Sequence, residues 1–123
     1  MITILVVDDD PGVRFLLRTI LENEGYGILE AGNGEAALAA IGSQVPDVVT
    51  TDLMMPVMTG AELIVKLRSA AATAKIPIVV VSSNPEAVKN LGVDAFVTKP
   101  FTASNLADRV RAVAGQLNRG QPV

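Results

Sequence analysis

The sequence predicts a single α/β domain, in which helices cover both faces of a parallel five-stranded sheet. Three observations carry this prediction. Five short runs rich in β-branched residues alternate along the chain with segments whose apolar residues recur at helical spacing. Some of these runs are apolar throughout, which is typical of strands buried on both faces. Pro, Gly, Asn and Asp separate the segments, so strand and helix alternate through right-handed crossovers.

The expected strands are apolar runs of four to six residues that end at polar side chains. The fourth run, IVVV, is the most continuously β-branched. The proline at position 46 separates the second helix from the third strand. The strands are expected at residues 2–7, 28–31, 48–51, 78–81 and 95–98.

The expected helices have start and stop signals of their own. Asp10 and Pro11 suit the N-cap and first turn of the first helix, and Gly25 follows its end, where a left-handed residue is favoured. Asn33 introduces the second helix. The helices are expected at residues 13–21, 34–41, 61–69 and 102–117.

Composition limits both the size and the chemistry of the protein. The chain has 123 residues, 50% of them hydrophobic, and a mean hydropathy of +0.42, enough for one domain with a covered core. We expect residues 1–118 to form that domain and residues 119–123 a short tail. With no Cys and no His, disulfides, thiolate metal sites and histidine catalysis are excluded.

Charge and hydropathy patterning disfavour two classes of partner. The net charge is −3, the pI is near 4.8, and the 10 basic residues are scattered, so no basic footprint for nucleic acid or an anionic membrane is present. The first apolar run, residues 2–7, is broken by three aspartates and is too short for a signal peptide or a membrane span. These features predict a cytoplasmic protein.

The polar residues at the strand ends form the most coherent candidate site in the chain. In a sheet of this kind, sites lie at the carboxyl ends of the strands. Three carboxylates brought together there repel one another unless a cation compensates, and oxygen ligands suit Mg²⁺. The residues at the ends of the first, third, fourth and fifth strands are Asp8, Asp9, Asp52, Ser82 and Lys99.

This residue set suits phosphoryl transfer to a carboxylate. A carboxylate can attack phosphorus to give an acyl phosphate, and that transfer needs positioning and charge neutralisation more than acid–base groups. Lys99 can supply positive charge to the phosphoryl oxygens, and the Ser82 hydroxyl a hydrogen bond that forms only when phosphate is present.

Four segments resemble the receiver domains of bacterial two-component systems, and the likeness spans nearly the whole chain. They are VVDDDPGVR at 6–14, TDLMMPVMTG at 51–60, VVVSS at 79–83 and VTKPF at 97–101. The resemblance implies the flavodoxin-like fold with strand order 2-1-3-4-5. It also implies a phosphorelay protein rather than an enzyme acting on other substrates.

The resemblance assigns roles to individual residues. Asp52 is the implied phospho-acceptor, and Ser82 and Lys99 contact the phosphoryl group. The implied Mg²⁺ ligands are the side chains of Asp8, Asp9 and Asp52 and the backbone carbonyl of Met54. Phe96 lies where the family has an aromatic switch residue, and Lys99-Pro100 where it has a cis peptide bond.

The implied partners are proteins. The phosphoryl donor is a sensor histidine kinase or a phosphotransfer protein, and a downstream protein target reads the altered surface. The resemblance implies a monomer or a weak homodimer, with no direct contact to nucleic acid or membrane.

The sequence departs from the family pattern at two places. Thr59 stands where the family usually has an acidic residue, before the turn glycine Gly60. The segment from Ser82 to Phe96 is shorter than in the family generally, which leaves residues 86–91 as about one and a half turns of a fourth helix. We therefore expect a remodelled output face.

Some of these residues also have purely structural interpretations. Asp10 is better explained as a helix cap than as a metal ligand. Ser82 can simply end a strand, and Phe96 can be plain core. Residues Met54, Met55 and Met58 either fill gaps in a loop or offer an adaptable contact surface to a kinase or target.

Two alternative functions stay open on the sequence. The first is a receiver-fold interaction module that is not phosphorylated, suggested by the short fourth helix. The second is a haloacid-dehalogenase-like phosphatase with Asp8 as nucleophile, suggested by the Asp8-x-Asp10 pattern, although the chain is short for that class. A nucleotide-binding Rossmann fold is disfavoured, because DDDPG replaces the glycine-rich phosphate loop.

Overall fold

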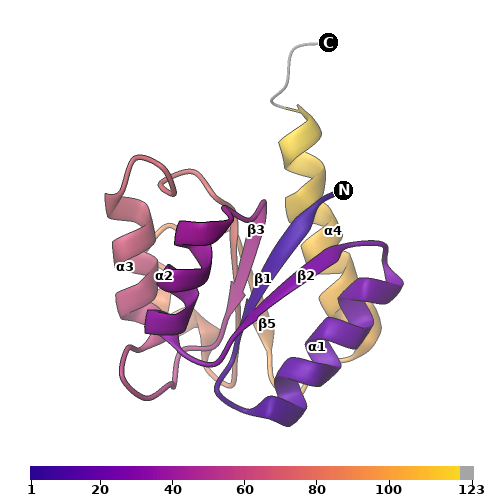
Figure 1. The fold of residues 1–123 in the computed structure, drawn as a ribbon. Helices are drawn as coiled ribbons and strands as arrows, with labels where there is room; N and C mark the ends of the chain where they lie inside the picture. The colour runs from indigo at the N-terminus through magenta and orange to yellow at the C-terminus, as the bar shows by residue number, and fades with distance from the viewer. Residues whose placement is uncertain (120–123) are drawn as a thin grey trace.

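The computed structural model describes residues 1–119. They contain one parallel five-stranded sheet with the strand order β2-β1-β3-β4-β5 (Figure 1). Every neighbouring pair of strands is parallel, as expected. The predicted strand order is therefore confirmed. The strands are β1 (Thr3–Val7), β2 (Gly27–Ala31), β3 (Val48–Thr51), β4 (Ile78–Ser82) and β5 (Ala95–Thr98).

Three α-helices and one short 3₁₀ helix connect the strands, and a fourth α-helix follows the last strand. The helices are α1 (Pro11–Asn23), α2 (Gly34–Ser43), α3 (Gly60–Ser69), η1 (Pro85–Val88) and α4 (Ala103–Arg119). Helices α2 and α3 lie on one side of the sheet, and α1 and α4 on the other (Figure 1). The chain thus has the doubly wound architecture that the sequence predicts.

Each face of the sheet has its own hydrophobic core. Because successive strand residues point to opposite faces, β1 sends Leu5 and Val7 toward α2, α3 and η1, and Ile4 and Val6 toward α1 and α4. All four of these side chains are buried. A strand with both faces covered in this way is apolar throughout, which explains the TILVV sequence of β1.

The helix signals read from the sequence act as expected. The Asp10 side chain accepts hydrogen bonds from the backbone N–H groups of Gly12 and Val13, and caps α1. Asn33 caps α2 by accepting from the N–H of Ala36. Gly25 follows α1 with φ of +94°, a conformation that a side chain would strain. The structural interpretation of Asp10 as a cap is confirmed.

The connection between β4 and β5 differs from the prediction. The prediction of an α-helix over residues 86–91 is wrong, because the only helix in this segment is the one-turn 3₁₀ helix η1. Asn84 precedes η1 without a side-chain cap, and Gly92, at φ of +75°, redirects the chain toward β5. So short a segment cannot repeat the α-helical hydrogen-bonding pattern, and the 3₁₀ form, with its i→i+3 bonds, suits it better.

Arg68, near the end of α3, holds this short connection in place. Its guanidinium donates hydrogen bonds to the carbonyl of Gly92 at 2.7 and 3.1 Å, and to the carboxylate of Asp94 at 3.0 Å. It also donates to the carbonyls of Ala74 and Ile76 at 3.0 and 2.6 Å. One side chain therefore links the loop before β4 to the loop before β5, in place of the packing that a full helix would supply.

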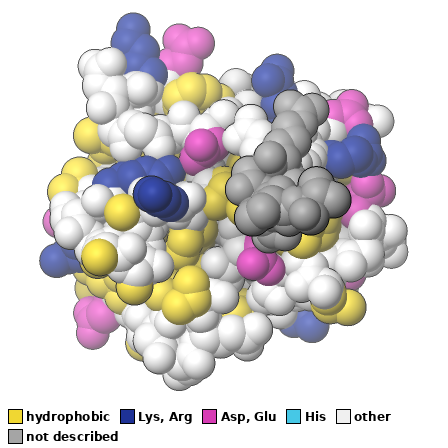
Figure 2. Space-filling model, turned by 90° about the horizontal axis from the view of Figure 1, so that it is seen from above, with side chains coloured by type: hydrophobic (Ala, Val, Ile, Leu, Met, Phe, Trp, Pro, Cys, Tyr) yellow, Lys and Arg dark blue, Asp and Glu magenta, His cyan; other side chains and the backbone are white. Residues whose placement is uncertain are grey.

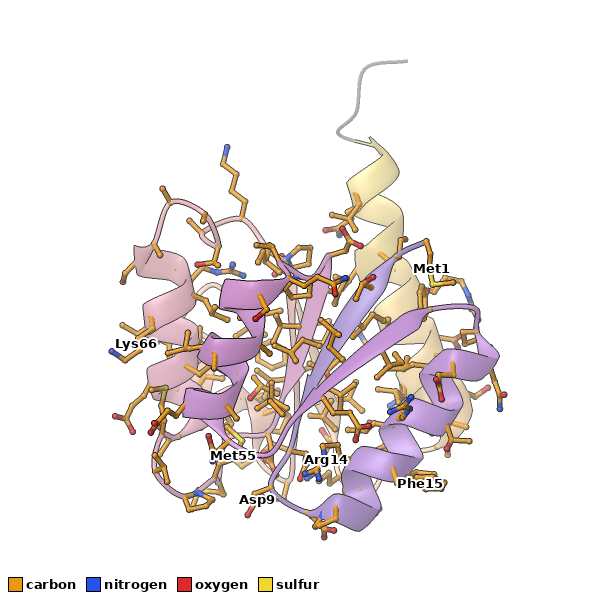
Figure 3. All side chains as sticks on the ribbon, in the orientation of Figure 1. Met1, Asp9, Arg14, Phe15, Met55 and Lys66 are labelled. Atoms are coloured by element: carbon orange, nitrogen blue, oxygen red, sulfur yellow. The ribbon has the colours of Figure 1, made fainter. Side chains whose placement is uncertain are left out.

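We expect Arg68→Met to destabilise the protein by about 2–3 kcal/mol, because three backbone carbonyls lose their donor and the Asp94 carboxylate loses its cation. Urea unfolding followed by circular dichroism measures this loss. Lys66→Met on the same helix is the matched control, since Lys66 is exposed and points away from the domain (Figure 3) and should change stability by less than about 0.5 kcal/mol. Equal effects of the two substitutions would contradict the role given to Arg68.

The C-terminal helix α4 begins after Thr102, whose hydroxyl accepts a hydrogen bond from the N–H of Asn105 at 3.0 Å. It continues to Arg119, the first residue of the expected tail, and residues 120–123 lie outside the described part of the chain. Among residues 1–119, no helix is both long and apolar enough to cross a membrane. Figure 2 views the end of the molecule at which the strands begin, where acidic and basic side chains are interspersed.

Candidate functional site

The predicted site residues come together because four parallel strands end at the same edge of the sheet. Register pairs Val7 of β1 with Thr51 of β3, so Asp8 and Asp52, the residues that follow, lie side by side. On the other side, the backbone N–H of Lys99 donates to the carbonyl of Ser82 at 2.9 Å. The sheet alone thus places four of the five predicted residues at one edge.

Three carboxylates form an acidic cluster at this edge. One oxygen from each of Asp8, Asp9 and Asp52 lies within 4.8 Å of the others. Asp8 and Asp52 are only 1% and 8% exposed, whereas Asp9 is exposed at the end of the molecule where the strands finish (Figure 3). The sequence prediction that these three residues meet is confirmed.

Lys99 bridges the two buried carboxylates. Its Nζ lies 3.0 Å from Asp8 Oδ2 and 2.8 Å from Asp52 Oδ2. Burial lowers the pKa of the Lys99 ammonium, but its hydrogen bonds to Asp52 and Asp8 outweigh this effect, and the net pKa lies above its ordinary value. Lys99 therefore carries its positive charge into the cluster at neutral pH. The peptide bond that follows it, Lys99–Pro100, is cis, as the resemblance implies.

The Asp8 carboxylate has both of its oxygens occupied by donors. Oδ1 accepts the backbone N–H of Asp10 at 2.9 Å, and Oδ2 accepts Lys99. Burial raises the pKa of Asp8 above its ordinary value, because the hydrogen bonds from Asp10 and Lys99 only partly offset the loss of solvent and the nearby charge of Asp52. The charged form of Asp8 is thus under-compensated in this arrangement.

Asp52 is held at the end of β3 by its own neighbours. Its Oδ1 accepts the backbone N–H of Leu53 at 2.6 Å, while its backbone carbonyl accepts the Thr51 hydroxyl at 2.8 Å. With Oδ2 on Lys99, each oxygen of the carboxylate accepts a hydrogen bond, and the two bonds fix its orientation. A side chain fixed in this way needs little reorganisation to react.

The charges of the cluster suit a divalent cation. Three carboxylates face a single ammonium, which leaves an excess of negative charge. Asp8 and Asp52 are buried, so water solvates their charges poorly. Carboxylate oxygens are hard ligands of the kind Mg²⁺ prefers, and a partly exposed set leaves room for the waters that this ion retains. The donor set therefore fits the cation that the sequence predicts.

Ser82 and Phe96 lie near the site in different environments. Ser82 is the last residue of β4 and is buried, and its hydroxyl accepts the backbone N–H of Asn84 at 3.3 Å. Phe96 in β5 is half-buried and packs against the core beneath α2 and α3. In this structure Phe96 is a core residue, and its role as a switch stays a prediction.

The three methionines of the β3–α3 loop divide between core and surface. Met55 is buried, and Met58 packs against the same core, so the gap-filling interpretation is confirmed for both. Met54 is 77% exposed and lies two residues beyond Asp52. Of the three methionines, Met54 is therefore the one whose side chain can serve as a contact surface for a partner.

Thr59 has a role that was visible in the sequence but missed. It is the N-cap of α3, and its hydroxyl accepts the N–H of Glu62 at 3.2 Å while the Glu62 side chain accepts the N–H of Thr59 at 3.1 Å. The Thr-x-x-Glu spacing is the signature of a capping box. Thr59 therefore caps α3 at the position where the family usually has an acidic residue.

Gly60 is more than a turn residue. It is the first residue of α3, and a Cβ at this position would lie 2.0 Å from the backbone oxygen of Asp52. Its N–H donates to the carbonyl of Leu53 at 3.0 Å. The start of α3 is therefore packed directly against the backbone that carries Asp52, which the local sequence does not reveal.

An apolar groove opens beside Lys99, with a volume of about 370 Å³. Val13 and Leu16 of α1 line one side, and Pro100 and Phe101 the other. The neighbouring Phe15 is 69% exposed and points outward from α1 (Figure 3). Apolar surface beside a polar site is typical of a protein-binding region.

The comparisons with known proteins agree with this geometry. The family model of the response regulator receiver domain matches residues 4–111. The phosphate regulon transcriptional regulatory protein PhoB of Pseudomonas aeruginosa is 35% identical over 123 residues, which cover 96% of this chain and 54% of PhoB. The sensor histidine kinase TmoS of Ectopseudomonas mendocina is 40% identical over 112 residues, 87% of this chain and 11% of TmoS.

Solved structures show the same likeness. The signal receiver domain of a signal transduction histidine kinase from Syntrophus aciditrophicus superposes with a TM-score of 0.90 at 30% identity, covering 100% of this chain and 97% of that domain. The chain spans about half the length of the first curated relatives that it matches. Fold, acidic site and sequence likeness together show that the chain belongs to the response regulator receiver domain family of two-component signal transduction.

Proposed function

We propose that this receiver accepts a phosphoryl group on Asp52. The observation that carries the proposal is the position of Asp52 Oδ2, 2.8 Å from Lys99 Nζ and inside the cluster with Asp8 and Asp9. The carboxylate is fixed, retains 8% exposure and lies next to the Lys99 ammonium, whose pKa is raised. These are the requirements of a nucleophile for phosphoryl transfer, in which positioning and electrostatic stabilisation do most of the work.

The proposed reaction moves one phosphoryl group from a phosphohistidine to Asp52. A carboxylate oxygen of Asp52 forms the new P–O bond, the P–N bond to the donor histidine breaks, and the electron pair leaves with the imidazole. Lys99 exchanges its contact with Asp52 for the phosphoryl oxygens and stabilises their charge. When bound by Asp8, Asp9, Asp52 and the Met54 carbonyl, Mg²⁺ would neutralise the negative charge of the carboxylates and the phosphate.

Ser82 is the proposed sensor of the phosphoryl group. Its hydroxyl is held at 3.3 Å from the Asn84 N–H, a long and weak contact that is easily exchanged for a phosphoryl oxygen. Movement of this hydroxyl would vacate space at the end of β4, beside β5. We propose Phe96 as the residue that responds, since register pairs it with Val80 in the same strand as Ser82.

The proposed partners are a histidine kinase or phosphotransfer protein as donor and a protein target as reader. The likeness to the receiver segment of a sensor histidine kinase supports the first. The apolar groove beside Lys99 and the exposed Phe15 offer a surface to such a partner next to the reacting carboxylate. We propose a cytoplasmic protein, monomeric or weakly dimeric, that does not bind nucleic acid itself.

The test is phosphorylation by a small donor. Incubation of the protein with acetyl phosphate and Mg²⁺ is expected to add one phosphoryl group, detected by intact-protein mass spectrometry as an acid-stable, alkali-labile adduct. EDTA is expected to prevent the addition, because the cluster then keeps its uncompensated negative charge. A protein that stays unmodified in Mg²⁺ would overturn the proposal and favour the interaction module.

The phosphatase alternative with Asp8 as nucleophile finds no support in the geometry. Asp8 is 1% exposed, against 8% for Asp52, so a phosphoryl donor reaches the Asp52 carboxylate more easily. Its raised pKa also reflects burial, not activation by a base. Asp52 is the better placed nucleophile of the two.

A further inference from the structure

Arg14 makes a contact with the backbone of the acidic cluster that the family resemblance did not assign. Its Nη1 donates a hydrogen bond of 2.8 Å to the carbonyl of Asp8, and its Nε lies 3.1 Å from Glu30 Oε1 in β2. Figure 3 shows Arg14 and Asp9 at the same end of the molecule. The guanidinium thus ties the residue that carries one buried carboxylate to the neighbouring strand.

The contact lies where β1 stops pairing with the sheet. The N–H of Asp8 still donates to the carbonyl of Ala31 at 3.1 Å, whereas the next N–H groups leave the ladder for the turn into α1. The Asp8 carbonyl is therefore the first group of this turn that needs a partner outside the sheet. Arg14, on the first turn of α1, supplies that partner and closes the loop back onto the strand.

We propose that Arg14 is a positioning residue, which orients the Asp8–Asp9 turn for cation binding through the Asp8 carbonyl and takes its own orientation from Glu30. This inference rests on the proposed function, since it concerns the same cation site. Arg14 touches neither the carboxylates of the cluster nor a bound group. Its action is on the peptide that joins two of the three acidic residues.

Arg18 provides an internal comparison. It also binds Glu30, at 2.5 Å to Oε2, and it binds Glu22 at 3.2 Å, but it makes no hydrogen bond with the turn. The Arg18 side chain is 41% exposed, against 23% for Arg14. Two arginines therefore share one glutamate, and only one of them reaches the site.

A positioning role and a purely electrostatic role of Arg14 predict opposite changes in Mg²⁺ affinity when Arg14 is removed. A positive charge near the cluster repels Mg²⁺, so its removal should tighten Mg²⁺ binding if electrostatics alone mattered. If Arg14 positions the turn, its removal should weaken Mg²⁺ binding, because the ligands lose their orientation. Outer contacts that orient metal ligands commonly change metal affinity by about 10- to 100-fold.

The experiment compares Arg14→Met with Arg18→Met by calorimetric titration of the metal-free proteins with Mg²⁺. We expect Arg14→Met to weaken Mg²⁺ binding about tenfold, and Arg18→Met to change it less than about threefold, as befits an exposed ion pair. Arg14→Lys should restore part of the affinity, since an ammonium can reach the Asp8 carbonyl but cannot also present the Nε contact to Glu30.

A second readout follows the turn without the cation. The Asp10 amide, which donates to Asp8 Oδ1, should exchange its hydrogen faster by NMR in metal-free Arg14→Met than in Arg18→Met. Melting curves of the variants separate this local change from general destabilisation.

The outcomes distinguish the two proposals. Wild-type protein that binds no Mg²⁺ and accepts no phosphoryl group would overturn the proposed function. Wild-type protein that does both, with Arg14→Met and Arg18→Met alike in Mg²⁺ affinity or with Arg14→Met binding more tightly, would overturn the positioning role alone.

Discussion

Asp52→Asn is expected to abolish phosphorylation by acetyl phosphate while leaving the protein folded. The amide oxygen of Asn can still accept the N–H of Leu53, which Asp52 Oδ1 accepts at 2.6 Å, so the side chain keeps its position at the end of β3. The amide is not a nucleophile toward phosphorus, and Lys99 keeps its second partner, Asp8. Intact-protein mass spectrometry in Mg²⁺ measures the loss, and circular dichroism checks the fold.

Asp10→Asn is the matched control for this substitution. It removes the same charge from the same end of the molecule, but Asp10 caps α1 through Gly12 and Val13, and Asn caps a helix as well as Asp does. We therefore expect Asp10→Asn to be phosphorylated at nearly the wild-type rate. An adduct that survived in Asp52→Asn, located by peptide mapping at another aspartate, would show that the acceptor has been misassigned.

The site could be predicted from the sequence because its main residues are placed by the sheet. Asp8, Asp52 and Lys99 each follow the last residue of a strand, and parallel order alone brings such residues to one edge. Recognising five strands was therefore enough to assemble the cluster. The helix caps Asp10 and Asn33 were equally predictable, since a cap depends on residues within three positions.

Contacts that depend on the exact path of a loop or the rotation of a helix were not predictable in this way. The donation from Arg14 to the Asp8 carbonyl depends on how α1 turns back over β1, and no local pattern marks it. The segment between β4 and β5 shows the same limit. The family resemblance and the length of the segment predicted a short helix, but hydrogen bonds from Arg68 to Gly92 and Asp94 hold a different path.

The path of this short connection does not involve the acidic cluster. Val88 of η1 is buried in the core beneath α2 and α3, and Leu91 packs against the same core, so the short connection still covers its side of the sheet. The acidic cluster and Lys99 lie on other connections and keep their contacts. We therefore expect the proposed acceptance of a phosphoryl group and its reading by a target to depend on different parts of the chain.

Gly60→Ala is expected to have the largest effect on stability among single-methyl changes near the site. The added Cβ would lie 2.0 Å from the backbone oxygen of Asp52, 2.8 Å from the Cα of Leu53 and 2.9 Å from the backbone carbon of Asp52. All three are backbone atoms that no rotamer change can move away. Either α3 or the end of β3 must shift, and we expect a cost of about 3 kcal/mol or more.

The same shift should damage the chemistry, because the displaced atoms belong to Asp52 itself. We expect Gly60→Ala to be phosphorylated by acetyl phosphate more than about tenfold more slowly, at a temperature where circular dichroism shows it folded, since small displacements of reacting groups are costly. Urea unfolding measures the stability change.

Gly115→Ala is the matched control, for which we expect a change in stability of the opposite sign. Gly115 lies within α4, and a Cβ there would meet nothing within 4 Å. Alanine in an open helical position is favoured over glycine by about 0.5–1 kcal/mol. We therefore expect the same glycine-to-alanine change to stabilise the protein at position 115 and to leave phosphorylation unaltered. If Gly60→Ala matched Gly115→Ala in stability and rate, the packing of α3 against the Asp52 backbone would not be what holds the acceptor in place.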